Sequence, residues 1–278
     1  MRLIRRSKLF LLDEILGKIA RIESTVNFLY DNLELSGQEL SIFELQNDLS
    51  SARKTKKFQK AFKDKSPKIS VIIPISRSAK IAERSILSVV NQTYSNIEII
   101  LVVEKIRKDI SNLVIKIKDS RITLLVNEGA SQITGNWSNW AVSGGQSRSY
   151  GMQHANGDFF TFLDDDDLMQ PTKIEKCVNF AQEFSHEIVG HLDGSYFDGK
   201  LLPLRSNKIG KTRNYPGGSV DYLGLGTNVV LIHNFFLKVN WPKFNYKNLK
   251  GNDTVYLRMI FSLNPRYGFI NEILTIKN

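Results

Sequence analysis

The spacing of apolar residues changes near residue 66 and divides the chain into two parts. In the first part, apolar residues recur at alternating intervals of three and four, which is the spacing of a coiled-coil seam. They are Leu12, Ile15, Ile19, Ile22, Val26, Leu29 and Leu33. Ser36-Gly37-Gln38-Glu39 then combines a helix break with a capping-box pattern. We therefore predict a helical, coiled-coil-like segment that ends in a basic linker over residues 1–66.

The apolar seam of the first helix requires a partner, and three partners fit the sequence. The helix could fold back on its own chain, pair with a second copy to form a homo-oligomer, or lie on a membrane surface. The membrane option rests on basic residues that flank the first apolar positions, which are Arg2, Arg5, Arg6 and Lys8. The sequence leaves these three alternatives open.

Residues 53–68 form the predicted linker and carry eight basic residues against the single acid Asp64. Phe58 and Phe62 are the only large apolar residues among them. We interpret this stretch as a solvated tether or charged helix face, and contact with anionic lipid or a polymeric acceptor is the alternative.

From residue 67 onward, short apolar runs alternate with amphipathic segments, as in repeated βαβ units. The pattern predicts strands at residues 68–75, 97–103, 121–126 and 158–163, and helices at 79–91, 147–155 and 171–184. Beyond residue 186 it predicts strands at 187–196, 228–232 and 267–276, and a helix at 254–262. We therefore expect an α/β domain over residues 67–278, with a mostly parallel sheet flanked by helices.

Composition narrows the class of protein without naming its function. The chain has 278 residues, of which 42% are hydrophobic and 24% charged, as in soluble globular proteins. No apolar run approaches the roughly 18 residues of a membrane span. The single cysteine, Cys177, cannot form an internal disulfide, so a cytoplasmic location is expected. A net charge of +10 favours anionic partners, and it is compatible with contact at the inner face of the membrane.

The most informative chemical feature is an apolar strand that ends in four carboxylates, Asp164-Asp165-Asp166-Asp167. In an open α/β sheet, ligands bind beyond the carboxyl ends of the strands. Four like charges on one turn repel each other, and a divalent cation relieves that repulsion. Carboxylate oxygens suit Mg²⁺ or Mn²⁺, whose remaining ligands are usually water and substrate phosphates. A diphosphate substrate follows; a solvated acidic turn before the helix at Pro171 is the alternative.

A series of sequence blocks between residues 68 and 184 carries a family resemblance. The blocks are Ile69-Ser70-Val71-Ile72-Ile73-Pro74, Ser88-Val89-Val90-Asn91-Gln92-Thr93-Tyr94, Asn96-Ile97-Glu98-Ile99-Ile100, Arg148-Ser149-Tyr150-Gly151, Ala155-Asn156-Gly157-Asp158 and the aspartate run. In this order and spacing they resemble family 2 glycosyltransferases, which have the Rossmann-like GT-A fold. The resemblance implies an inverting transfer of a sugar from a nucleotide-diphosphate donor, a UDP-sugar, to a hydroxyl of a glycan, lipid-linked or protein acceptor.

The resemblance also implies roles for the four aspartates. Asp164 and Asp166 match the family's Asp-x-Asp motif, which holds the metal and the donor's ribose and diphosphate. Asp167 is expected in the same metal shell, and Asp165 is expected to contact the donor.

Four further residues are expected to bind the donor by the same resemblance. Arg148 matches an arginine placed to bind the donor phosphate or orient the aspartates, although an ordinary surface arginine is the alternative. Pro74 and Ile75 end the first strand, where the family contacts the nucleotide base. Glu104 stands in for one member of the acidic pair that usually follows the second strand, and the loss of the other member leaves the nucleotide open.

The transfer requires a general base that removes the proton of the acceptor hydroxyl. The segment from Gly251 to Arg258 resembles the family's late helix, with Asn252 in place of the usual glutamate and Asp253 in the catalytic position. Asp253 is the predicted base, and a role as helix cap is the alternative.

Two loops and two other function classes also fit parts of the sequence. The 127–145 loop contains Trp137 and Trp140, which suit either stacking on a ligand or packing, and the basic residues near 205–213 suit either a closing loop or a solvated one. A sugar nucleotidyltransferase would carry a Gly-rich loop, which residues 75–79 lack. A non-catalytic basic adaptor for an anionic polymer or membrane gives no reason for the four aspartates, and no nucleic-acid partner is expected.

Overall fold

The computed structural model describes residues 42–128, 144–204, 212–214, 220–222, 225–241 and 252–277. The predicted coiled-coil seam, both tryptophans of the 127–145 loop and the side chains of the basic 205–213 segment lie outside this range. The chain divides into two compact units, Met1–Asp48 and Leu49–Asn278. The second unit carries the sheet and the candidate site.

The second unit is built on a sheet of nine described strands, in the order β3-β2-β1-β4-β10-β6-β11-β5 with β7 paired to β6. The strands are β1 (Ile69–Pro74), β2 (Ile97–Val103), β3 (Ile122–Val126), β4 (Phe159–Phe162), β5 (Leu168–Met169), β6 (Ile188–Phe197), β7 (Lys200–Pro203), β10 (Val230–His233) and β11 (Tyr267–Ile276). β8 (Thr212–Asn214) and β9 (Val220–Tyr222) form a separate ribbon.

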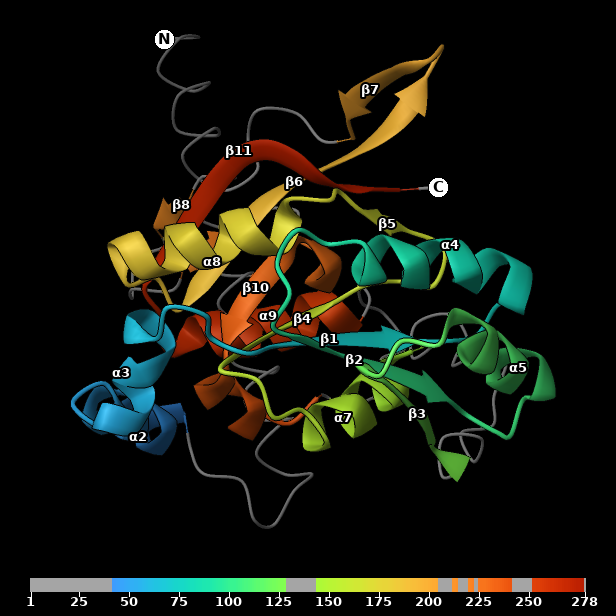
Figure 1. Ribbon diagram of the computed structural model, residues 1–278. Helices are drawn as coiled ribbons and strands as arrows, with labels where there is room; N and C mark the ends of the chain where they lie inside the picture. Colours follow the sequence, from blue (N-terminus) through green and yellow to red (C-terminus); the bar gives the residue numbers. More distant parts are fainter. Residues whose placement is uncertain are drawn as a thin grey trace, which may run out of the picture. The chain divides into compact units, whose positions relative to one another are not determined.

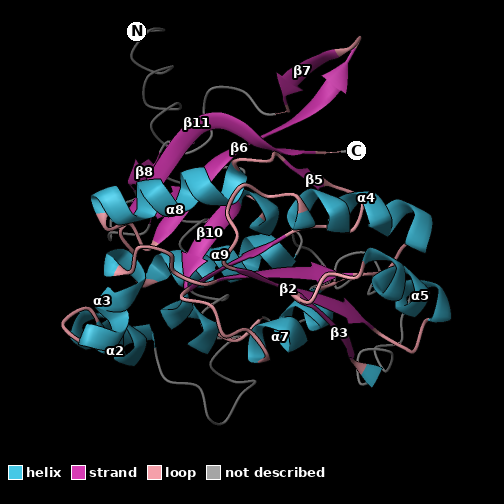
Figure 2. Cartoon of the chain, in the orientation of Figure 1, coloured by secondary structure: helices cyan, strands magenta, loops and turns pink. Residues whose placement is uncertain are grey.

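Strands β1 to β4 run parallel, which confirms the mostly parallel sheet expected from the sequence. β10 runs antiparallel to both β4 and β6, and β11 returns parallel to β6. Every residue of β1 is buried because helices cover both faces of the sheet (Figure 2). The carboxyl ends of β1, β2 and β4 therefore meet at one edge.

The helices that cover the sheet lie close to the predicted ranges, except for α5 (Lys108–Ile117), which the sequence pattern did not predict. They are α4 (Ala79–Val90), α5 (Lys108–Ile117), α7 (Gly145–Gln153), α8 (Lys173–Phe184) and α9 (Asn252–Ser262), with α2 (Ile42–Ala52) and α3 (Lys56–Lys63) before the sheet. Helices α4 and α8 lie on one face and α7 on the other (Figure 1). Within the described ranges, no helix is both long and apolar enough to cross a membrane.

Helix α7 approaches the sheet closely because it presents a glycine to it. A methyl group at Gly151 would lie 2.5 Å from Cγ2 of Ile72 on β1 and 3.2 Å from Cγ2 of Val102 on β2. No larger side chain fits there without displacing the helix. This contact fixes the distance between α7 and the edge where β1 ends.

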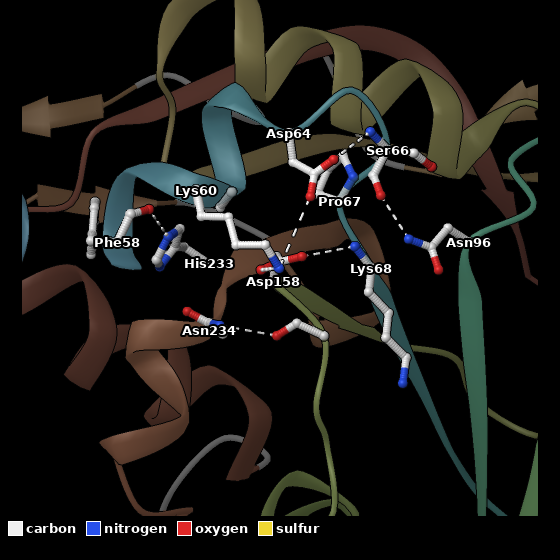
Figure 3. A network of polar contacts seen from close by, with 12 residues as sticks. Phe58, Lys60, Asp64, Ser66, Pro67, Lys68, Asn96, Asp158, His233 and Asn234 are labelled. Carbon is white, nitrogen blue, oxygen red and sulfur yellow. Dashed lines mark hydrogen bonds and ion pairs between the residues drawn. The ribbon is translucent and has the colours of Figure 1, made fainter. Parts of the chain in front are cut away.

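The basic stretch expected as a solvated linker contains helix α3, whose apolar side is buried. Phe58 and Phe62 are 4% and 9% exposed, whereas the lysines of the helix face solvent. The ring of His233 stacks on both phenylalanines, at centroid distances of 4.0 and 5.3 Å. Nε2 of His233 donates to the Phe58 carbonyl over 3.1 Å (Figure 3), and burial lowers the pKa of His233 to about 4.

A buried carboxylate holds the chain just before α3. Glu187 is fully buried and accepts hydrogen bonds from Arg53 Nε at 2.7 Å and Arg266 Nε at 2.9 Å. Burial alone would raise the pKa of Glu187, but the hydrogen bond from Arg53 and the nearby arginine charges lower it instead. Residues 49–66 therefore belong to the same compact unit as the sheet, whereas the change in apolar spacing places the boundary at 66.

We predict that Phe58→Ala lowers the free energy of unfolding by about 3–5 kcal/mol, because it removes a buried ring and leaves a cavity beside His233. Urea unfolding measures the change. The matched control is Ile115→Ala, which truncates a side chain that is 68% exposed and should change stability by no more than about 0.5 kcal/mol. A loss below about 1 kcal/mol for Phe58→Ala would show that α3 does not stabilise the unit.

Candidate functional site

The candidate site lies at the edge where β1, β2 and β4 end. Pro74 ends β1, Val103 ends β2, and Phe162 ends β4, one residue before Leu163 and the four aspartates. We call Asp164–Asp167 the aspartate turn, because the Asp167 amide donates to the Asp164 carbonyl over 3.1 Å. The four carboxylates thus gather where an open α/β sheet binds ligands.

Asp164 is held between two cations from distant parts of the chain. Nη2 of Arg148, from α7, donates to Oδ1 of Asp164, and Nζ of Lys277, after β11, lies 3.4 Å from Oδ2. Burial favours a raised pKa for Asp164, but the charges of Arg148 and Lys277 outweigh it and lower the pKa. Asp164 is therefore a carboxylate at neutral pH.

Asp165 ties the aspartate turn to the loop after β1. Its Oδ2 accepts hydrogen bonds from the backbone amides of Ser76 and Arg77, over 2.7 and 2.6 Å. The residue is only 5% exposed. Asp165 thus supports the turn, and its expected contact with the donor stays a prediction.

Asp166 forms an ion pair with Arg77 on the same loop. Nη2 of Arg77 lies 2.7 Å from Oδ2 of Asp166, and Nε lies 3.7 Å from Oδ1 of Asp165. The side chain of Arg77 is 52% exposed and that of Asp166 is 27% exposed. This pair borders solvent, so an incoming ligand can replace it at low cost.

Asp167 is the most enclosed of the four side chains, at 3% exposure. Its Oδ2 accepts a 2.6 Å hydrogen bond from the Asn228 amide and lies 2.8 Å from Nζ of Lys277. Burial raises the pKa of Asp167, and Lys277 offsets that shift only in part. The two carboxylates beside Lys277 raise the pKa of that lysine against the effect of its own burial.

A second lysine lies beneath the turn. Lys173 is fully buried, and its ammonium group donates to the Asn228 carbonyl over 2.7 Å and to Oγ1 of Thr275 over 3.1 Å. Burial lowers the pKa of Lys173 to about 8. Lys173 therefore fixes the backbone of Asn228, whose side chain in turn holds Asp167.

Arg148 is positioned by a glycine and a tryptophan. Gly144, at φ 81°, precedes α7, and a methyl group on it would lie 2.8 Å from Nη1 of Arg148 and 3.6 Å from Cγ of Pro74. The guanidinium lies over the Trp241 ring, 5.7 Å from its centroid. Among the described residues, the buried Nε of Arg148 has no hydrogen-bond partner. Pro74, Arg148 and Asp164 thus line one corner of the site.

Asp253 lies near the aspartate turn rather than on a remote surface. A methyl group at Gly226 would lie 3.7 Å from Oδ2 of Asp253 and 3.0 Å from Oδ1 of Asn228. Asn228 binds Asp167, so the loop at 226–228 connects the two acidic positions. Asp253 is half-buried in the first turn of α9.

The structure brings together most of the residues that the sequence predicted and adds several others. Ile75 is buried after β1, and its amide donates to the Val102 carbonyl over 2.8 Å, while Glu104 is exposed directly after β2. Sequence reasoning missed Arg77, Lys173, Asn228 and Lys277. The one available signal was charge: four adjacent carboxylates require cations from elsewhere in the fold.

Known proteins similar to this chain were found in three comparisons. The family described as "Glycosyl transferase family 2" matches residues 70–241. A protein of Haemophilus influenzae, described as an uncharacterized glycosyltransferase, is 31% identical over 166 residues, or 57% of each chain. The UDP-Glc:alpha-D-GlcNAc-diphosphoundecaprenol beta-1,3-glucosyltransferase WfgD of Escherichia coli is 32% identical over 111 residues, or 40% of each chain.

Among solved structures, residues 1–349 of S. aureus TarS in complex with UDP-GlcNAc share the fold, with a TM-score of 0.54 at 18% identity. This match covers 75% of the chain and 58% of TarS 1–349. The chain spans little more than half the length of the Haemophilus relative. Because the family match covers more than half of the sequence and the sheet is that of the GT-A fold, the chain belongs to glycosyl transferase family 2.

Proposed function

We propose that the protein is an inverting glycosyltransferase, which moves a sugar from a UDP-sugar to a hydroxyl of a lipid-linked glycan with the help of Mn²⁺ or Mg²⁺. The observation that carries the proposal is the aspartate turn, which faces Arg77, Arg148 and Lys277 at the carboxyl edge of the sheet. Arg77, Arg148 and Lys277 pair directly with these carboxylates, and the ammonium group of Lys173 lies beneath the turn, so acidic and basic groups alternate within one site. The site therefore suits a ligand that combines a diphosphate with a divalent cation.

The carboxylate oxygens of the aspartate turn suit a metal ion that also binds the substrate. Within the described residues, no three His, Cys, Asp or Glu side chains are grouped to enclose an ion. Mg²⁺ usually takes only one or two protein carboxylates and completes its shell with water and phosphate. Asp164 and Asp166, at 31% and 27% exposure, would hold it, whereas Asp167 is engaged by Asn228 and Lys277.

The basic side chains suit the phosphates of the donor. Arg148 presents a buried guanidinium with an unused Nε beside Asp164, and Lys277 reaches the same carboxylate from β11. A guanidinium binds phosphate oxygens in a planar, two-pronged arrangement. Pro74 and Ile75 would border the nucleotide base, with Glu104 at the end of the neighbouring strand.

Asp253 is the proposed general base. It would accept the proton of the acceptor hydroxyl as that oxygen attacks the anomeric carbon and the bond to the diphosphate breaks, which inverts the configuration in one step. When bound, a divalent ion supplies stabilisation of the charge that develops on the leaving diphosphate. The 226–228 loop supports this assignment because it links Asp253 to the turn that would hold the donor.

The donor and acceptor classes rest on the names of similar proteins. The E. coli relative uses UDP-Glc and an acceptor linked to diphosphoundecaprenol, and the TarS structure contains UDP-GlcNAc. We extend the UDP-sugar and the lipid-linked acceptor to this chain. The alternatives are glycan or protein acceptors without a lipid, and an acceptor screen would distinguish them from a lipid-linked acceptor.

We predict that Asp253→Asn lowers the transfer rate by about a hundred- to ten-thousandfold, because general-base assistance has that magnitude. Donor affinity should stay unchanged, because asparagine has nearly the same shape and the residue lies in the first turn of α9, outside the aspartate turn. Single-turnover transfer and donor titration measure the two quantities. Glu272→Gln, which removes an exposed carboxylate paired with Lys176, is the control. Turnover near the wild-type value in Asp253→Asn would exclude this residue as the base.

We predict that one member of a panel of nucleotide sugars raises the melting temperature by roughly 5–10 °C in Mn²⁺. This is the shift expected at about a hundred times the dissociation constant. EDTA should abolish the shift, because the aspartate turn would then lack the ion that joins it to the diphosphate. An equal shift in EDTA would argue against a metal site at the turn, and no shift with any donor would argue against the proposed function.

We predict that Lys277→Met strengthens Mn²⁺ binding in the absence of donor by about tenfold or more, because it removes a cation that competes for Asp164 and Asp167. Titration of free Mn²⁺ by electron paramagnetic resonance measures the affinity. The control is Lys116→Met, which removes an exposed lysine paired with Glu83. Weaker or unchanged Mn²⁺ binding in Lys277→Met would show that Lys277 does not compete with the ion for Asp164 and Asp167.

A further inference from the structure

The hairpin formed by β6 and β7 carries large apolar side chains in solvent. Tyr196, Phe197, Leu202 and Leu204 are 58%, 52%, 45% and 41% exposed. The hairpin projects beyond the rest of the sheet, next to the C-terminal end of the chain (Figure 1). Exposed apolar residues are ordinary when scattered, but four within nine residues of one projecting hairpin form a patch that indicates an interaction.

The strand register shows that the hairpin is apolar on both of its faces. Ser195 pairs with Leu202, Tyr196 with Leu201, and Phe197 with Lys200. Because side chains alternate between faces, Phe197 and Leu202 lie on one face and Tyr196 and Leu201 on the other. A hairpin that docks on a single protein surface needs only one apolar face. Two apolar faces suit a medium that surrounds the hairpin.

The hairpin has a well-defined tip. Asp198 and Gly199 connect the strands with φ values of 48° and 75°, and two consecutive positive φ values are typical of a type I′ turn. This turn matches the twist of the strands, so the apolar side chains are presented on a regular scaffold. The paired residues of each arm span roughly 13 Å, which exceeds the 5–10 Å that interfacial segments enter a bilayer.

The sequence that follows the hairpin is basic. Within the hairpin, Lys200 is offset by Asp198 at the tip, and after β7 the sequence continues with Arg205, Lys208, Lys211 and Arg213 without an acidic residue before Asp221. The chain as a whole carries a net charge of +10. Apolar side chains next to basic ones are the combination that binds the interface of membranes rich in anionic lipid.

The base of the hairpin is bonded to the candidate site. The Lys277 amide donates to the Gly194 carbonyl over 2.7 Å, and the Ser195 hydroxyl donates to the Lys277 carbonyl over 3.0 Å. The ammonium group of the same lysine lies 2.8 Å from Asp167. A surface held by the hairpin would therefore lie beside the edge at which the donor is proposed to bind.

From these observations we infer that the β6–β7 hairpin is a membrane-contact element, which inserts its apolar side chains into the interface of an anionic bilayer and holds the site next to it. The inference rests on the proposed function in one respect, since a lipid-linked acceptor would lie in the membrane that the hairpin contacts. The contact itself depends only on the hairpin and on the basic residues of the sequence.

Vesicle binding by the full chain tests the inference. Vesicles of equal parts phosphatidylglycerol and phosphatidylcholine should bind the wild-type chain, and Phe197→Ser combined with Leu202→Ser should weaken binding about tenfold or more. The matched control is Ile106→Ser combined with Ile115→Ser, which removes two exposed isoleucines, at 72% and 68%, away from the hairpin. Equal binding by the hairpin variant and the wild type would overturn the inference.

A fluorescent probe shows whether the hairpin itself enters the bilayer. Because Cys177 is the only cysteine and is buried, Tyr196→Cys can be labelled selectively with an environment-sensitive dye. The emission should shift to the blue and intensify on adding the anionic vesicles, whereas a dye at Ile115→Cys should not respond. An unchanged spectrum at position 196 would overturn the inference. So would sedimentation velocity that shows two copies of the chain associating through the hairpin.

Donor binding separates this inference from the proposed function. The hairpin variant should keep the melting-temperature shift caused by the UDP-sugar and Mn²⁺, because its substitutions are exposed and lie outside the aspartate turn. If the chain binds vesicles through the hairpin but binds no nucleotide sugar, only the proposed function is contradicted. If it binds the sugar donor but no vesicle, only the membrane contact is contradicted.

Discussion

The pairing of the aspartate turn with Arg77, Arg148 and Lys277 is the constraint on which the site depends. Four carboxylates at the end of a buried strand repel each other and lose hydration, and each unpaired charge there would cost several kcal/mol. The three cations come from the loop after β1, from α7 and from the end of β11. The turn therefore binds together segments that are far apart in the sequence, and any change in its charge acts on all three.

The same pairing gives the aspartates different roles. Asp165 and Asp167 are nearly buried and hold backbone amides and Asn228, so they support the turn. Asp164 and Asp166 are more exposed and pair with Arg148 and Arg77. The four identical residues thus differ both in burial and in the partners that hold them, and the proposed metal site uses the two that are more exposed.

Local patterns predicted most of the fold, whereas the partners of the aspartates could not be predicted. Strands β2 and β11 match their predicted ranges because alternation and apolar runs are properties of neighbouring residues. Lys277 lies 113 residues from Asp164, and only the sheet order brings them together. The basic stretch that contains α3 favours a tether or a charged helix face because its lysines outnumber Phe58 and Phe62, yet these two rings, one helical turn apart, decide its packing.

Lys277 gives the fold a direct physical link between its proposed ligand surfaces. Its backbone is hydrogen-bonded to Gly194 and Ser195 at the base of the β6–β7 hairpin, and its side chain neutralises Asp164 and Asp167. Lys277 therefore joins the hairpin to the turn through one backbone hydrogen bond and one hydrogen bond from the Ser195 hydroxyl. β11 also pairs with β5, directly after the turn, so the strand that precedes Lys277 is anchored to both elements. The same residue thus contributes to the base of the hairpin and to the charge balance of the turn.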